Sequence, residues 1–319
     1  MQFCKVAGES SLACDVKSRL SFRDLMLVLV VVTIWGFSFV TIRWALQSGP
    51  PFALAALRFF FAAVPAVLLV KRPNVPWRTL VAYGFAIGVF QFGLLFLGMQ
   101  LGMPAGLSSL VIQSQVFFTI GLAAWLLHDR VTSQSIIGAC IAAAGMAVLG
   151  AHKLIEGATA TFAGFLVVLG AALSWAVGNI ITKRAAAKAD VDVVGIVVWA
   201  SLAVPLPLAM ASFAFEGGFE ALERVAHMPW QAWASVLFMS YFATLFGLAA
   251  WNSLLHRYPT AVIAPFALLI PVSGLVSGAL FLGEELAPLQ FVGAALVLVG
   301  LTWNLYADRA REWMARTLD

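Results

Sequence analysis

The sequence predicts an all-α integral membrane protein with ten transmembrane helices, arranged as two inverted repeats of five helices each. Three observations support this fold class. Hydrophobic residues make up 62% of the 319 residues and charged residues only 11%, about half the charged fraction of a soluble domain. Ten apolar runs each come close to the roughly 20 residues that cross a hydrocarbon core about 30 Å thick. The second five runs resemble a degenerate copy of the first five.

The ten runs are continuous rather than alternating, which favours helices over the strands of a membrane barrel. We expect the spans at 24–46, 52–71, 78–100, 104–127, 134–150, 162–183, 193–214, 230–252, 260–282 and 288–306. The first repeat then occupies 24–151 and the second 162–306, between an N-terminal tail at 1–23 and a C-terminal tail at 307–319. A re-entrant segment at 134–150 is the alternative, and the charge distribution argues against it.

Basic residues predict the orientation of the chain in the membrane. With ten spans, fifteen Lys and Arg residues fall on the side of both tails, whereas Arg43, Lys153 and Arg224 fall on the other. Because Lys and Arg favour cytoplasmic loops, we expect a multi-pass protein of the cell (inner) membrane with both termini in the cytoplasm. The tail at 1–23 lacks the apolar core of a cleavable signal.

The composition also argues against several partners and cofactors. The basic pI of about 9.1 follows from membrane topology, and no basic–aromatic groove suggests a nucleic acid. The three cysteines, Cys4, Cys14 and Cys140, have no metal-ligand spacing. We therefore expect the lipid bilayer and a small-molecule substrate as partners, with no cofactor, no metal and no disulfide.

Matching residues recur at two fixed distances along the chain. The pairs 140 residues apart are Trp35 with Trp175 and Val64-Pro65 with Val204-Pro205, and those 155 residues apart are Pro104 with Pro259, Gly138 with Gly293 and Gly145 with Gly300. The shift of 15 fits an insertion in the acidic loop 215–229. Because each copy has an odd number of spans, the two copies must be inverted relative to each other. This design predicts a substrate site near the membrane midplane and transport by alternating access.

Arg58 is the first candidate for a substrate contact. It lies about six residues inside the second span, roughly 9 Å deep at 1.5 Å per residue. A charge within the membrane is costly and indicates function by default. Its guanidinium could bind a substrate carboxylate through two hydrogen bonds. The structural alternative is that Arg58 extends outward to the interface or caps backbone carbonyls of a neighbouring helix.

Polar and aromatic residues on other spans complete the candidate site. Gln113 and Gln115 make the fourth span the most polar, and amides suit a zwitterion because they both donate and accept. Hydrogen bonding between helices is the alternative explanation for all such residues. The predicted substrate-binding set is Trp35, Ser38, Arg58, Gln91, Gln113, Gln115, Trp175 and Asn179.

Prolines and glycines predict how some spans bend and pack. Pro265 and Pro271 in the ninth span remove backbone donors and predict a kinked helix, either as a gate or as a merely bent support. Four glycines let the fifth and tenth spans approach closely, within one chain or across a homodimer, and these are Gly138, Gly145, Gly293 and Gly300.

Acidic residues are informative by their positions. All fifteen Asp and Glu residues fall in the tails, in loops or at span ends. Proton-coupled carriers usually relay protons through embedded carboxylates or histidines. We therefore expect a facilitator or a substrate exchanger. A membrane-embedded enzyme is a distant alternative, because no nucleophile–base pair or Asp-rich motif is visible.

Several short motifs resemble a known family. They are Trp35-Gly36, Leu57-Arg58-Phe59, the segments 102–107, 113–120 and 174–180, Ala264-Pro265 and Ile270-Pro271-Val272. From about 24 to 306 the chain resembles the EamA domain pair of the drug/metabolite transporter superfamily, and the closer motifs are similar to the O-acetylserine/cysteine exporter branch. The resemblance implies export of small amino acids or amino-acid metabolites across a bacterial inner membrane. Drug or nucleotide-sugar carriage within the same superfamily is the alternative.

Overall fold

The computed structural model describes residues 20–127, 133–155, 159–186, 192–258, 263, 266–267, 269–285 and 287–318. Every regular element within these residues is helical, as the sequence predicts. The helices of the first half are α1 (Phe22–Leu46), α2 (Pro51–Leu69), α3 (Trp77–Tyr83), η1 (Gly84–Phe92), α4 (Gly93–Gln100), α5 (Ala105–Val111), η2 (Ile112–Ser114), α6 (Gln115–Leu127) and α7 (Ser133–Ile155).

The second half contains a matching series of helices. They are α8 (Thr159–Ala186), α9 (Val193–Ala200), η3 (Ser201–Ala203), α10 (Pro205–Phe215), α11 (Phe219–Ala226), α12 (Trp230–Leu237), η4 (Phe238–Phe246), α13 (Gly247–Arg257), α15 (Leu269–Leu282) and α16 (Pro288–Leu318). In both halves some spans consist of consecutive helical segments. The predicted kink residue Pro265 lies outside the described residues.

Seven helical stretches in the described part of the chain are long and apolar enough to cross a membrane. Three shorter apolar helices, at 136–148, 269–282 and 288–303, coincide with the fifth, ninth and tenth spans expected from the sequence. The prediction of an all-α integral membrane protein is therefore confirmed. The count of ten spans and the inversion of the repeat stay predictions.

Local sequence explains where the helices begin and break. The Ser21 hydroxyl accepts a hydrogen bond of 3.2 Å from the Asp24 N–H and so caps α1. Pro51 stands at the start of α2, where the missing N–H costs nothing. Pro205 separates η3 from α10, because proline cannot donate the hydrogen bond that would continue a helix.

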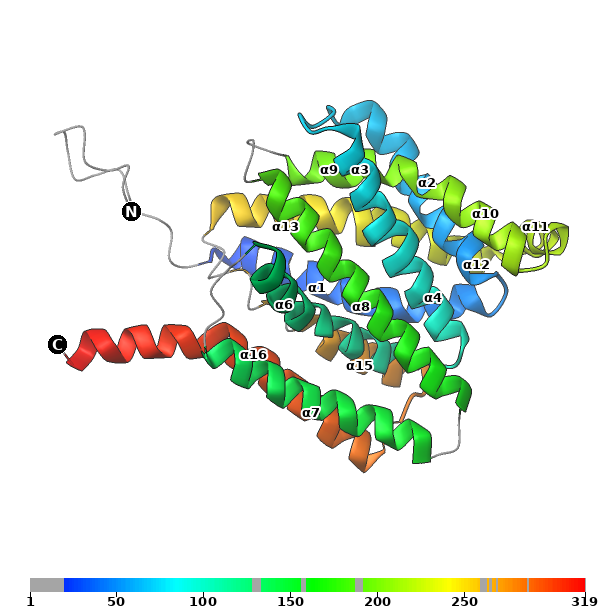
Figure 1. Cartoon of the computed structure of the whole chain (residues 1–319). Helices are drawn as coiled ribbons and strands as arrows, with labels where there is room; N and C mark the ends of the chain where they lie inside the picture. Colours follow the sequence, from blue (N-terminus) through cyan, green and yellow to red (C-terminus); the bar gives the residue numbers. More distant parts are fainter. Residues whose placement is uncertain are drawn as a thin grey trace.

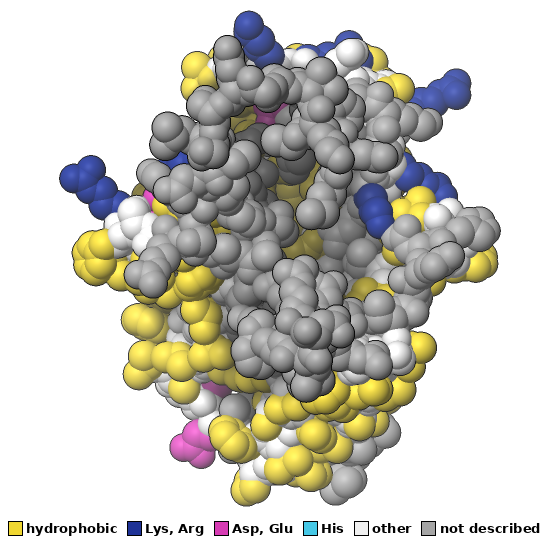
Figure 2. Space-filling model, turned by 90° about the vertical axis from the view of Figure 1, so that its left-hand side faces the viewer, with side chains coloured by type: hydrophobic (Ala, Val, Ile, Leu, Met, Phe, Trp, Pro, Cys, Tyr) yellow, Lys and Arg dark blue, Asp and Glu magenta, His cyan; other side chains and the backbone are white. Residues whose placement is uncertain are grey.

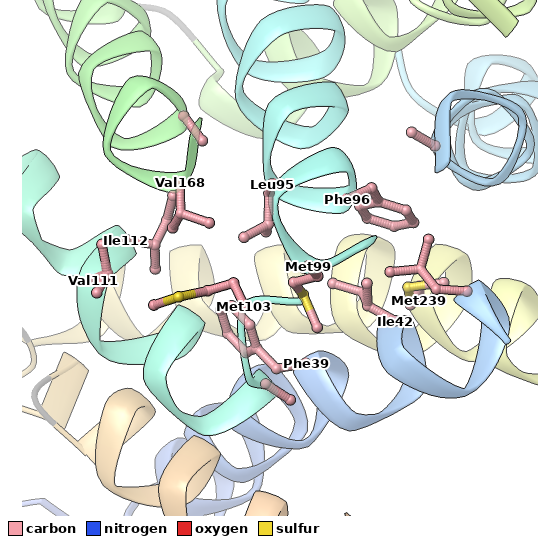
Figure 3. Close-up of a cluster of buried hydrophobic side chains, with 14 of the residues drawn as sticks. Phe39, Ile42, Leu95, Phe96, Met99, Met103, Val111, Ile112, Val168 and Met239 are labelled. Atoms are coloured by element: carbon pink, nitrogen blue, oxygen red, sulfur yellow. The ribbon is translucent and has the colours of Figure 1, made fainter. Parts of the chain in front are cut away.

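The helices pack side by side around a continuous apolar core. Close neighbours are α7 with α16, α1 with α15, α4 with α8 and α2 with α10 (Figure 1). Figure 3 shows the core where α1, α4 and α8 meet, with Phe96, Met99 and Val168 among its members. Phe96 and Met99 are both fully buried. This core fixes the relative positions of the helices that carry the candidate site.

The outer surface is apolar along the sides of the bundle. Leu69 and Leu206 are 86% and 69% exposed, and many other large apolar side chains are also uncovered. A soluble monomer rarely exposes so much contiguous apolar surface, whereas lipid covers it well. Lys and Arg side chains instead gather around the edge of the end face where α1 begins and α16 ends (Figures 1 and 2). The protein is therefore a multi-pass membrane protein with a basic end.

Candidate functional site

Two wide-turn helical segments lie at matching places in the two halves. The π-helical segments η1 and η4 each contain nine residues, and each is followed at once by an α-helix that begins with glycine. Phe-Gly-Leu stands at this junction both times, at 92–94 and at 246–248. Because π-helical turns are rare and concentrate at functional sites, the two segments mark the region to inspect.

Side chains from neighbouring helices bind the carbonyls within these segments. The Ser174 hydroxyl of α8 donates to the Ala86 carbonyl O of η1 at 2.8 Å. The Trp35 indole N–H of α1 donates to the Ala243 carbonyl O of η4, also at 2.8 Å. Trp35 and Trp175, which follows Ser174, are the tryptophans that the internal repeat pairs. Each π segment is thus tied to a helix of the opposite half near this tryptophan.

Arg58 lies buried between the two π segments. Its side chain comes from α2, and the residue is 5% exposed. The guanidinium carbon lies 3.9 Å from the centroid of the Phe92 ring, at the end of η1, and Nη2 donates to Thr244 Oγ1 of η4 at 3.2 Å. The Ser240 hydroxyl of η4 donates to the Arg58 carbonyl O at 2.9 Å. At 5% exposure Arg58 does not extend to the interface, and among the described residues its guanidinium caps no backbone carbonyl, which were the two structural roles considered from sequence.

Much of the Arg58 guanidinium has no hydrogen-bond partner. Its Nε and Nη1 are buried and unpaired within the described residues. Burial of a charged group without partners costs several kcal/mol, and contact with an aromatic ring offsets part of that. The arrangement is therefore a buried cation with free donors.

A second polar group joins the fourth and sixth spans. The Asn179 amide Nδ2 donates to Gln115 Oε1 at 2.8 Å and to Thr119 Oγ1 at 3.1 Å. Gln115 Oε1 also accepts from Thr119 Oγ1 at 3.4 Å. The structure thus brings together two residues of the predicted set and adds Thr119, which that set omits. All three are only partly buried, so their remaining donors and acceptors can reach other groups.

The other predicted residues are buried or partly buried. Gln91 and Gln113 are 3% and 5% exposed, and their amides form no hydrogen bond with any described residue. Ser38 donates to the Trp35 carbonyl O of its own helix at 2.6 Å, so its hydroxyl is engaged locally. Trp175 packs half-buried against the apolar core. Among the described residues, no hydrogen bond joins these side chains to Arg58.

The predicted packing and kink residues lie where helices meet. A Cβ placed on Gly145 would lie 2.7 Å from the Gly293 carbonyl O, and one on Gly300 would lie 2.6 Å from the Gly138 carbonyl O. These four glycines therefore hold α7 against α16 within one chain. Pro271 is buried in α15, and its carbonyl O accepts from the Ser109 hydroxyl at 3.3 Å.

Acidic side chains in the described residues lie near helix ends, in loops or in the part of α16 beyond the expected tenth span. Glu284 Oε1 and Oε2 accept from the backbone N–H groups of Ala105 and Gly106 at 2.6 and 2.8 Å, at the start of α5. Glu216 Oε1 accepts from the Phe52 N–H at 2.8 Å, at the start of α2. At the basic end, Asp24 forms an ion pair of 2.6 Å with Arg257. Among the described residues no three His, Cys, Asp or Glu side chains gather as metal ligands would.

Some members of the site were missed from sequence. Arg58 is held by contacts with Thr244, Ser240 and Phe92. Nothing in the local sequence of these three residues distinguishes them from other membrane residues. The repeated Phe-Gly-Leu at 92–94 and 246–248 is the signal that could have located both π segments.

Comparison with known proteins gives a consistent result. Residues 23–151 and 162–306 each match the EamA-like transporter family. The chain is 39% identical to proteins of Salmonella typhimurium and Escherichia coli, each named a probable amino-acid metabolite efflux pump, over 92% of this chain and 98% of the relative. It is 30% identical to a Streptantibioticus cattleyicolor protein named a probable terminal-alkyne amino-acid exporter, over 89% of this chain and 93% of that relative.

A solved crystal structure shares the fold. It covers 88% of this chain and 96% of its own, with a TM-score of 0.56 and 19% sequence identity.

Proposed function

The chain belongs to the EamA-like transporter family, and from this membership we propose that it exports small amino acids or amino-acid metabolites by alternating access, as a facilitator or an exchanger. It is a transporter and not an enzyme. The observation that carries the proposal is the buried Arg58, held between π segments of the two halves with free hydrogen-bond donors. The names of the relatives support the amino-acid class.

We further propose ten spans in two inverted repeats. The family matches the chain twice, once in each half. Contacts between helices follow the same pattern: α2 packs with α10, α5 with α15 and α7 with α16, which are equivalent spans of the two halves. The contact of α1 with α15 corresponds to that of α8 with α6, and the contact of α1 with η4 to that of α8 with η1. A two-fold axis in the membrane plane would produce these correspondences.

The proposed orientation has both termini in the cytoplasm of a bacterial cell, with the bundle in the inner membrane. The basic edge at the end where α1 begins and α16 ends supports it, because Lys and Arg favour the cytoplasmic side (Figure 2). Glu284 and Glu216 then lie at the outer end, and the Asp24–Arg257 ion pair at the inner end. A homodimer stays a prediction, and its contact would lie away from the glycines that join α7 to α16.

The proposed transport needs no proton relay through the protein. Among the described residues, carboxylates lie near helix ends, in loops or in the part of α16 beyond the expected tenth span, and Arg58 is the one buried Lys or Arg. A relay requires embedded groups that gain and lose protons, and a guanidinium does not do so in the physiological range. The substrate's own gradient, or exchange with another substrate, would then supply the driving force.

Counterflow in proteoliposomes tests the proposal. The purified protein would be offered labelled cysteine, O-acetylserine, threonine and phenylalanine, with and without a pH gradient. We expect saturable counterflow of at least one of these compounds at a rate that the gradient leaves unchanged. Absence of counterflow with all four would overturn the substrate class, and uptake that depends strictly on the gradient would overturn the facilitator or exchanger mode.

A further inference from the structure

The unpaired donors of the Arg58 guanidinium can bind a ligand through two parallel hydrogen bonds. A guanidinium has five N–H donors, and among the described residues the hydrogen bond to Thr244 Oγ1 uses one of them. Nη2 carries two N–H bonds, so its second one still forms a fork with either Nε or Nη1, both of which are buried and unpaired. Such a fork matches the two oxygens of a carboxylate.

The neighbouring side chains position the Arg58 guanidinium but supply no negative charge to it. Phe92 stacks on one face of the guanidinium, at 3.9 Å from the ring centroid, and Phe59 lies further away at 5.9 Å. Thr244 is itself fixed, because its hydroxyl donates to the Met239 carbonyl O at 2.9 Å. No acidic side chain among the described residues pairs with Arg58. A positioned, desolvated cation without an anion therefore lies between the halves.

We propose that Arg58 is the subsite for the carboxylate of the transported molecule, which narrows the substrate class to monocarboxylates. This inference rests on the proposed function, because it assigns one group of the amino-acid substrate to one residue. The single cation favours a monoanion, since a phosphate-bearing molecule would require further buried Lys or Arg residues, and the described residues contain none besides Arg58.

The position of the subsite links ligand binding to the two halves. The guanidinium touches η1 through Phe92 and η4 through Thr244, and these segments belong to opposite repeats. A carboxylate that pairs with Arg58 removes the cost of an uncompensated buried charge. Closure of the halves around Arg58 is then more favourable with the substrate bound than without it.

The test compares acids with their carboxamides on one purified protein. Ligand binding would be measured by thermal shift and by scintillation proximity, and transport by counterflow. The probes are L-cysteine, L-threonine, L-phenylalanine and propionate, each beside its amide. The variants are Arg58→Gln, Arg58→Lys and Thr244→Val. The matched control is Arg43→Gln, because Arg43 also lies in a span but donates to the Met99 carbonyl O at 3.3 Å.

We expect the wild-type protein to prefer acids to amides. Arg58→Gln should weaken the binding of acids by about 10- to 100-fold and leave that of amides unchanged, as expected for loss of hydrogen bonds to a charged group. The affinity of Arg58→Lys for acids should lie between those of the wild-type protein and Arg58→Gln, because lysine keeps the charge but cannot donate two parallel hydrogen bonds. Thr244→Val should weaken acid binding less than Arg58→Gln, and Arg43→Gln should retain the wild-type preference.

The other possible results show whether the carboxylate subsite or the proposed transport function is wrong. Equal binding of acids and amides by the wild-type protein, or a preference for acids that survives in both Arg58 variants, would overturn the subsite even if amino acids are transported. Acid binding that depends on Arg58, without counterflow of any amino acid, would support the subsite and overturn the transport proposal. Failure of the wild-type protein to bind any of the four acids would overturn the subsite. If Arg58→Gln does not fold, the affinities of Arg58→Lys and Thr244→Val for acids and amides are compared with those of the wild-type protein instead.

Discussion

The carboxylate of Glu284 caps the helix that begins at Ala105, at the end of the bundle opposite the basic edge. Glu284 Oε1 accepts from the Ala105 N–H at 2.6 Å, and Oε2 accepts from the neighbouring Gly106 N–H at 2.8 Å. The two residues are 179 positions apart and belong to different halves of the chain. Because a carboxylate suits the positive end of a helix, this contact joins the two halves at the end opposite the basic edge.

We predict that Glu284→Gln loosens this contact between the halves and favours opening at the end proposed to face outward. The amide retains one acceptor but lacks the charge, so the closed state should lose about 1–2 kcal/mol, or roughly a tenfold change in population. The measurement uses Ser108→Cys, fully buried one helical turn below Ala105, as a reporter in a background without Cys4, Cys14 and Cys140. Its reaction with an impermeant thiol reagent added outside should become several-fold faster. Glu285→Gln, next in the chain and exposed, should leave the rate unchanged.

Asp24→Asn should slow the labelling of the Ser108→Cys reporter from outside, because it loosens the opposite end of the bundle. Asp24 accepts from Arg257 Nη1 at 2.6 Å and from the Tyr258 hydroxyl at 2.7 Å, which joins α1 to the end of α13. Arg257 is 47% exposed, so the ion pair contributes at most about 1 kcal/mol, and the bond to Tyr258 adds a similar amount. Outside labelling of the same reporter should slow a few-fold, and combination with Glu284→Gln should restore an intermediate rate. Arg23→Gln is the control, and faster labelling in Asp24→Asn would contradict the prediction.

Asn179→Leu should raise the KM of counterflow by roughly ten- to thirtyfold. The substitution removes the donor to both Gln115 and Thr119, and each lost neutral hydrogen bond corresponds to about 1 kcal/mol. Thr182→Val, one turn further along α8, is the control, because the Thr182 hydroxyl donates only to the Gly178 carbonyl O of its own helix. A merely structural role predicts instead that Asn179→Leu lowers the melting temperature and leaves KM unchanged.

Gly145→Ala should destabilise the protein, whereas Gly121→Ala should not. The new methyl group at position 145 would meet the Gly293 carbonyl O at 2.7 Å, and this backbone atom cannot move aside cheaply. Overpacking of this kind costs about 1–3 kcal/mol. At Gly121 nothing lies within 4 Å, so alanine should be neutral or improve helix stability by up to about 1 kcal/mol. Thermal unfolding in detergent compares the two, and equal melting temperatures would contradict the close packing of α7 on α16.

The sequence predicts the helices well because hydropathy over a span of about 20 residues is a property of the segment alone. The π-helical segments inside spans could not be predicted in the same way. The bonds of Ser174 to Ala86 and of Trp35 to Ala243 join residues 88 and 208 positions apart, so the turns they accompany depend on tertiary contacts. Only the repeated Phe-Gly-Leu offered a local signal.

The candidate site was predictable to a similar extent. The polarity of the fourth span pointed to Gln115, and the structure joins it to Asn179. Spacing could not show that Ser38 bonds to its own helix, because a serine hydroxyl chooses its partner by rotamer. Nor could it find Thr244, the partner of Arg58 at a distance of 186 residues.

The two nine-residue π segments have a consequence for how the spans can move. Successive residues of an α-helix are rotated by about 100° around its axis, and a π turn accommodates one residue more than an α turn. Migration of that additional residue along the span would rotate the portion it passes by roughly this angle about the helix axis, while the backbone hydrogen bonds of that portion are re-formed. Spin labels on either side of η4 would report such a twist as a change in separation without bending. Such a rotation would move side chains of the third and eighth spans without a hinge, and it would require the hydrogen bonds of Ser174 and Trp35 to these segments to break and re-form.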